Sequence, residues 1–198
     1  SDYNKNYSSD DAGVLFDKNK ETLICVPAGK YGTYNVPDGV VTISENAVYG
    51  CSNLTGVTIP DSVQHVGDYA FYDCKKLACT TYDNAKYIGN SNNPYMVLLA
   101  ATSTGITSCM VHPQTRFIES YAFSSCTALK DIFMQDSIIG IASYAFSRCS
   151  AIKNITYCGT EAQWNEIVLG DNSELLKATR TYHGEATAEA NCTTPSVC

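Results

Sequence analysis

Large hydrophobic residues recur along the chain in one short pattern, in which the first, fourth and sixth positions are mostly apolar. The pattern occupies residues 31–36, 54–59, 77–82, 106–111, 129–134 and 152–157, so its first positions lie 23, 23, 29, 23 and 23 residues apart. This spacing predicts six β-strands whose large side chains, Tyr31 and Leu54 among them, point inward while the residues between them point outward. One unit repeated at such an interval predicts a solenoid of stacked coils.

A second pattern fills the stretches between these strands. It consists of an alanine, a larger apolar residue and a cysteine three positions later; the four cysteines are Cys51, Cys74, Cys126 and Cys149. We expect each stretch to run back across the coil and to form one helical turn near the alanine, as at residues 68–71. Phe71, Phe123 and Phe146 are then predicted to stack as a buried aromatic row, with Val48 as a smaller member in the first copy.

The pattern is interrupted or ends at four places. Residues 83–104 break the repeat, and the NSNNP turn at 90–94 between apolar segments predicts a β-hairpin. We interpret this hairpin as a tolerated insertion or as a docking element for a neighbouring domain. Residues 13–27 predict a second hairpin, which would cover the exposed edge of the first coil. Residues 1–12 are expected to be a flexible lead-in, residues 13–184 a single repeat domain with caps, and residues 185–198 a polar, cysteine-containing tail.

Composition narrows the classes of partner. With 44% hydrophobic residues the chain can form a substantial core, yet it has no apolar run near the ~18 residues that a membrane span needs. The net charge is −7 with only 13 basic residues, and no cluster of lysine and arginine occurs. Nucleic acid and membrane insertion are therefore not expected, and we expect a monomer.

Three stretches carry a resemblance to a known family. The unit IPDSVQHVGDYAFYDCKKL resembles the BspA-like leucine-rich repeats found on bacterial and protozoan surface proteins. The opening GVLFDKNKETLICVPAGKYGTYNVPDGV and the closing YCGTEAQWNEI resemble the first and last units of that family, so the likeness covers roughly residues 13–184. It implies an α/β leucine-rich-repeat solenoid with a parallel β-sheet on the concave face, short helical turns on the convex side and a hairpin cap at the N-terminus. It also implies an extracellular or cell-surface protein acting in adhesion, without catalytic residues or cofactors.

The ten cysteines allow three roles. Zinc sites use closely paired cysteines with accompanying histidines, and the spacings Cys74-x4-Cys79 and Cys192-x5-Cys198 do not fit, so no metal is expected. Equivalent cysteines in neighbouring coils would lie ~4.8 Å apart with parallel side chains, whereas a disulfide needs Cβ atoms at ~3.8 Å. The repeat cysteines, joined by Cys109, are therefore predicted to form a ladder of small buried thiols. Cys192 and Cys198 are the best candidates for a disulfide; Cys25, Cys79 and Cys158 lie outside the repeat pattern.

No arrangement of residues predicts an enzyme. The three histidines, His65, His112 and His183, occupy non-equivalent positions in the repeat. Cys79 is predicted to point outward and could pair with a histidine, but the sequence offers no third residue to orient such a pair. A phosphate loop, a nucleophile elbow and a carboxylate pair are all missing from the sequence. The single tryptophan, Trp164, follows the helix-capping sequence that starts at Thr160, and we expect it to pack against the end of the solenoid rather than to stack on a ligand.

The outward strand positions form the candidate binding face. They are nearly uncharged, and the apolar pair Met110 and Phe133 near their middle suits a host or matrix protein or a glycan. The candidate residues are Thr58, Cys79, Thr81, Ser108, Met110, Asp131, Phe133, Asn154 and Thr156, preceded by Thr33, Asn35 and Gly56 on the earlier strands. The alternative function is a structural spacer that displays another domain.

Overall fold

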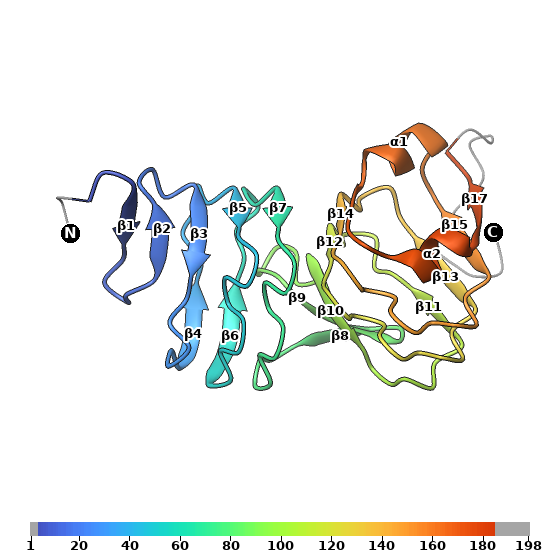
Figure 1. Cartoon of the computed structure of the whole chain (residues 1–198), viewed down its shortest axis with the longest axis horizontal. Helices are drawn as coiled ribbons and strands as arrows, with labels where there is room; N and C mark the ends of the chain where they lie inside the picture. Colours follow the sequence, from blue (N-terminus) through green and yellow to red (C-terminus); the bar gives the residue numbers. More distant parts are fainter. Residues whose placement is uncertain (1–3, 185–198) are drawn as a thin grey trace. The chain divides into compact units, whose positions relative to one another are not determined.

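The computed structural model describes residues 4–184, which divide into two compact units. The N-terminal unit contains the chain up to residue 79 together with residues 88–94, and the C-terminal unit contains residues 80–87 and the chain from residue 95 onward. In each unit, strands from successive coils lie side by side (Figure 1). Each unit is therefore a mostly-strand stack of successive coils.

Two sheets make up the N-terminal unit. The five-stranded sheet begins with three antiparallel neighbours and continues with two parallel strands; in order it contains β1 (Tyr7–Ser9), β2 (Leu15–Asp17), β3 (Thr22–Cys25), β5 (Thr42–Ile43) and β7 (His65–Val66). The other sheet pairs β4 (Gly32–Asn35) with β6 (Leu54–Thr58) in parallel. β1 lies within the stretch expected to be a flexible lead-in, where the Ser8 hydroxyl donates to the Asp17 carbonyl at 2.7 Å.

Two further sheets make up most of the C-terminal unit. A four-stranded parallel sheet contains β11 (Ser108–Met110), β13 (Asp131–Met134), β15 (Asn154–Tyr157) and β17 (Thr179–Tyr182). A six-stranded sheet contains β16 (Val168–Leu169), β14 (Gly140–Ile141), β12 (Phe117–Ile118), β10 (Val97–Ala101), β9 (Ala85–Ile88) and β8 (Thr80–Tyr82). Residues 89–96 connect β9 to β10, which are neighbours in that sheet.

The return stretches are not helical turns, and this corrects the expectation. Within residues 4–184 the helices are α1 (Glu161–Glu166) and α2 (Ser173–Lys177), and neither is long and apolar enough to cross a bilayer. Each return instead combines a two-residue strand with turns containing left-handed residues; these are Asn46, Gly50, Tyr69, Asp73, Tyr121, Ser125, Tyr144 and Arg148. A left-handed residue interrupts a right-handed helix. The backbone therefore bonds to the next coil, as from Phe123 N to Ala145 O at 2.7 Å.

The members of the predicted aromatic row are buried, and stacking joins Phe123 to Phe146. Phe123 and Phe146 are fully buried in the C-terminal unit, with ring centroids 4.9 Å apart and planes at 13°. Phe71 and Val48 are buried in the N-terminal unit, where the Val48 N–H donates to the Ala70 carbonyl. Tyr31 departs from the prediction, because 82% of it is exposed. The β4–β6 register shifts between residues 32 and 33, so a glycine rather than Tyr31 lies opposite Leu54.

The six predicted strands do not form one continuous sheet, because the third of them, at residues 77–82, pairs elsewhere. The Ala78 N–H still donates to the carbonyl of Thr55 in β6, but the chain then turns away from β6, and β8 pairs antiparallel with β9. Gly89 takes the vacated position, since it bridges to Thr58 and accepts from the Ile59 N–H at 3.2 Å. The strand segments therefore form one sheet of two strands and another of four.

Candidate binding site

The four-stranded sheet brings six of the predicted residues together. Its register aligns one outward row through Ser108, Asp131, Asn154 and Thr179, and a second through Met110, Phe133, Thr156 and Thr181. Between the rows, Cys109, Ile132 and Ile155 point into the core and are fully buried. The two threonines of β17 were not among the predicted site residues. The Thr-x-Thr alternation of residues 179–181 was the signal in the sequence that could have placed them on this face.

The chemistry of this outward face differs from the prediction at Met110. Met110 lies beside Phe133 in register, but it is only 8% exposed, so it does not form an accessible apolar pair with it. The Tyr82 hydroxyl contacts its sulfur at 3.4 Å, and its backbone N–H donates to the Asp83 carboxylate at 2.7 Å. Phe133 is half-buried. The accessible groups of this face are therefore the Phe133 ring, threonine hydroxyls and the polar pair of Asp131 and Asn154.

That polar pair joins neighbouring strands. The Asn154 amide donates to the Asp131 carboxylate at 2.6 Å. This hydrogen bond fixes the position of the negatively charged side chain of the row. Thr179 and Thr181 are exposed on the adjacent strand, and Thr156 is half-buried. The outward face thus presents one aromatic ring among hydroxyl and amide groups.

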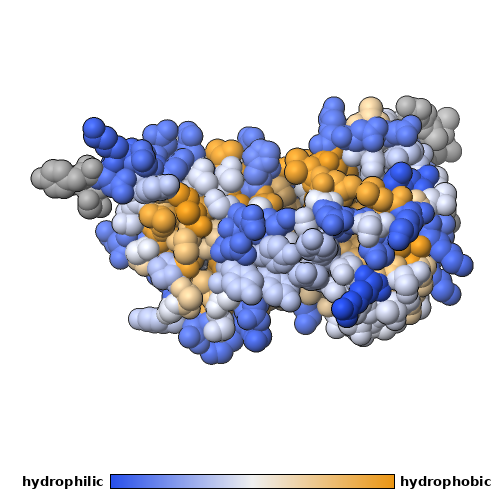
Figure 2. Space-filling view, in the orientation of Figure 1, coloured by the Kyte–Doolittle hydropathy of each residue, from blue (hydrophilic) through white to orange (hydrophobic). Residues whose placement is uncertain are grey.

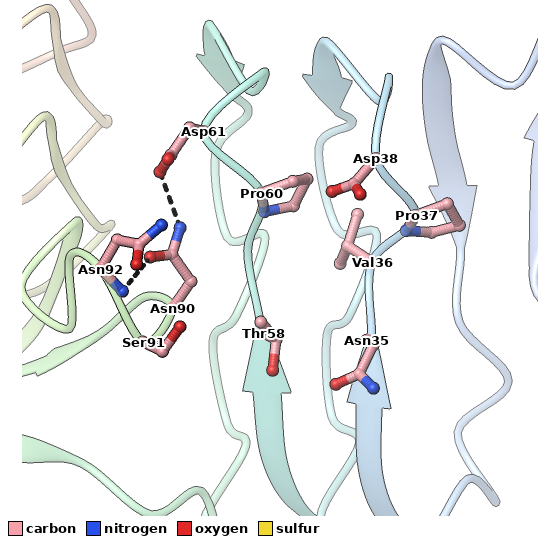
Figure 3. A pocket seen from close by; sticks show the side chains of 10 residues that line it. All are labelled: Asn35, Val36, Pro37, Asp38, Thr58, Pro60, Asp61, Asn90, Ser91 and Asn92. Carbon is pink, nitrogen blue, oxygen red and sulfur yellow. Dashed lines mark hydrogen bonds between the residues drawn. The ribbon is translucent and has the colours of Figure 1, made fainter.

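The other three predicted residues lie elsewhere. Thr81 is exposed on β8, which pairs with β9 and so belongs to a different sheet. Cys79 is exposed in the stretch before β8, where its sulfur contacts the Leu77 carbonyl at 3.3 Å. Thr58 ends β6 in the N-terminal unit and lies opposite Asn35 of β4. These two residues help to line a pocket of about 390 Å³, which is shown in Figure 3.

The buried thiols of the repeat are poor nucleophiles. Cys51, Cys109, Cys126 and Cys149 are free and fully buried, which confirms the prediction of buried thiols for these four; Cys74 is free and half-buried. Burial raises the pKa of each of the four, and that of Cys149 rises to about 12. A thiol rather than a reactive thiolate is therefore present at neutral pH. Cys158 is disulfide-bonded, whereas the predicted Cys192–Cys198 pair lies outside the described residues.

His112 and Trp164 have packing roles. His112 stacks on Tyr95 with ring centroids 3.6 Å apart, and burial lowers its pKa. His65 is exposed on β7. Trp164 is 6% exposed and packs edge-on against Tyr157 at 5.3 Å, and the capping box at Thr160 begins its helix as predicted. Within residues 4–184, no group of three histidine, cysteine or acidic side chains is placed to hold a metal ion.

Sequence comparison decides the family. The profile described as BspA type Leucine rich repeat region matches six copies in this chain, over residues 30–93 and 100–175. The chain belongs to the BspA-type leucine-rich repeat family. No curated protein matches this BspA-type chain.

Three solved structures resemble the BspA-type chain. They are a leucine rich cell surface protein from Faecalibacterium prausnitzii A2-165 (29% identity, TM-score 0.46), a leucine-rich repeat protein from Eubacterium ventriosum ATCC 27560 (22%, 0.45) and the pneumococcal vaccine antigen PcpA (14%, 0.46). The matches cover 83%, 91% and 92% of this chain and 42%, 40% and 49% of the three solved chains. The BspA-type chain thus spans less than half the length of each. At these TM-scores the likenesses carry no functional argument.

Proposed function

We propose that this chain is a non-enzymatic recognition module of an extracellular or cell-surface protein, with a host or matrix protein or glycan as its partner. Membership of the BspA-type repeat family supports this proposal. The single observation that carries it is the outward face of the four-stranded sheet, where two rows of side chains from successive coils lie in register. A repeat of this kind presents a wide, evenly spaced surface to a partner.

The partner-contacting centre of this face is Phe133. An aromatic side chain surrounded by small polar groups is the usual composition of a binding hot spot, because the ring supplies apolar contact area and its neighbours exclude water. Thr156 flanks it in register on β15, and Thr181 follows on β17. The Asp131–Asn154 pair in the adjacent row adds directional hydrogen-bonding groups.

The test measures binding of the whole chain to purified matrix proteins and glycans by biolayer interferometry. We expect Phe133→Ala to weaken binding of the recovered partner by about tenfold or more, which corresponds to ~1.4 kcal/mol. Tyr144→Ala is the matched control, because Tyr144 is also an accessible aromatic of the C-terminal unit but lies on a return stretch outside the sheet face. Equal affinities of the two variants would reject the sheet face, and no binding to any probe would favour the spacer function.

A further inference from the structure

A pocket of about 390 Å³ opens in the N-terminal unit where β4 and β6 end (Figure 3). This volume lies within the ~300–1,000 Å³ range of small-molecule sites. Ten residues from three consecutive segments line it: Asn35, Val36, Pro37, Asp38, Thr58, Pro60, Asp61, Asn90, Ser91 and Asn92. Two of its walls are strand ends one coil apart, and the third wall is the loop that follows Gly89.

The third wall is held in place by the side chain of Asn90. Its amide nitrogen donates to the Ile59 carbonyl at 2.8 Å and to the Asp61 carboxylate at 2.7 Å. Its amide oxygen accepts from the backbone N–H groups of Asn92 and Asn93 at 2.9 and 2.8 Å. The Asn90 amide thus uses both of its donors and both acceptor positions in anchoring the loop, and Figure 3 shows its bond to Asp61. The pocket is therefore shaped before any ligand arrives.

Other polar groups of the pocket remain available to a ligand. Within residues 4–184, five lining side chains make no hydrogen bond: those of Asn35, Asp38, Thr58, Ser91 and Asn92. Asn35 and Thr58 lie side by side on paired strands, because they are opposite each other in the β4–β6 register. The amides and hydroxyls can both donate and accept, whereas the carboxylate of Asp38 accepts only.

The charge of the lining selects the class of ligand. Asp38 and Asp61 are its ionisable residues, and lysine, arginine and histidine do not contribute to it. Such a lining repels anions. A simple cation would bind the carboxylates but would offer no acceptor to the amide and hydroxyl donors. A hydroxyl group of a ligand can donate to a carboxylate and can also accept from an amide or hydroxyl donor. Pro37 and Pro60 add apolar surface beside these groups.

We propose that this pocket binds a neutral sugar unit of a glycan. The vicinal hydroxyls of a pyranose ring would exchange hydrogen bonds with Asn35, Thr58, Asp38 and Asn92, while one C–H face of the ring contacts the prolines. The site is in the N-terminal unit and does not use the sheet face proposed above. Its ligand is therefore separable from any partner that binds through Phe133.

The experiment is a titration of the whole ¹⁵N-labelled chain with methyl glucoside, methyl galactoside and N-acetylglucosamine, followed by NMR. We expect at least one sugar to cause saturable shifts of the backbone amide signals of Thr58, Ser91 and Asn92. N-acetylneuraminic acid, an anionic sugar, should cause none. Asn35→Ala and Asp38→Ala should each weaken sugar binding by roughly three- to tenfold, as expected for the loss of one hydrogen bond.

Asp136→Ala is the matched control. Asp136 follows the strand residue Met134 by two positions, as Asp38 follows Val36, but it lies in the C-terminal unit and does not line the pocket. Its removal should leave sugar binding unchanged, and Phe133→Ala should do the same, which separates this proposal from the sheet-face function. Saturable shifts of the pocket signals with arginine but with none of the sugars would overturn the proposal. So would sugar shifts that persist undiminished in both pocket variants.

Discussion

Replacement of Phe123 by alanine tests how the coils of the C-terminal unit are held together. Phe123 is fully buried, its ring stacks on that of Phe146, and its carbonyl accepts from the Cys149 thiol at 3.0 Å. It occurs between two coils, so its loss removes contacts within its own coil and with the next one. In a solenoid, stability depends on such nearest-neighbour interfaces.

The size of the effect follows from burial and from the void that remains. Removing a fully buried phenylalanine side chain forfeits ~1.5–3 kcal/mol of transfer free energy. A residual void of ~50–100 Å³ adds ~1–2.5 kcal/mol at ~24 cal/mol per Å³. The expected total is ~3–5 kcal/mol, which is the usual cost of Phe→Ala in a core. For a chain of this size, each kcal/mol lowers Tm by ~2–4 °C, so a fall of roughly 6–20 °C is expected.

The assay is urea and thermal unfolding followed by the fluorescence of Trp164, the single tryptophan of the chain, which is buried in the same unit. Phe133→Ala is the control, because it is the same substitution at a half-buried position of the outward sheet face. It should cost about 1 kcal/mol or less. If Phe123→Ala is no more destabilising than Phe133→Ala, the stacked phenylalanines do not hold the coils together and the reasoning fails.

Two further changes probe the thiol ladder and the close packing of the returns. The pKa of Cys149 is about 12 in the folded chain against an ordinary 9.0, so its stabilising contribution is complete below pH 9 and is lost as pH rises toward 12. Anaerobic urea unfolding should show a loss of about 1 kcal/mol from this group at pH 10, and a Cys149→Ala variant with the same pH dependence would contradict the assignment. Gly67→Ala would place a Cβ 2.4 Å from the backbone nitrogen of Glu45 and should cost ~1–3 kcal/mol in the same assay. Gly29→Ala has no atom within 4 Å of the new Cβ and should change stability by ~0.5 kcal/mol or less, so equal effects of the two glycine substitutions would refute the steric argument.

The sequence by itself determined which residues are buried in the regular coils. A constant interval brings equivalent positions of successive units into the same row. Leu54, Leu129, Phe123, Phe146 and three of the four repeat cysteines could therefore be assigned to the interior without any knowledge of pairing. The same logic aligned Asp131 with Asn154 and Phe133 with Thr156, because a parallel register transfers the spacing of the sequence directly to the sheet. Repetition makes these contacts local, and local contacts can be read from a pattern.

Only the tertiary structure decided what happens where the interval changes. Residues 77–82 have the strand pattern, yet β8 pairs with β9 because Gly89 and the Asn90 amide occupy the place beside β6. The partner of a strand is the segment that makes the best hydrogen bonds and packing along its free edge, and that segment can be distant in the sequence. A local pattern of apolar residues does not show which of the competing segments will pair. The same competition displaced Thr81 from the predicted face and built the pocket beside Thr58 and Asn35. It also placed Tyr82 over Met110, so a residue predicted to be accessible became buried.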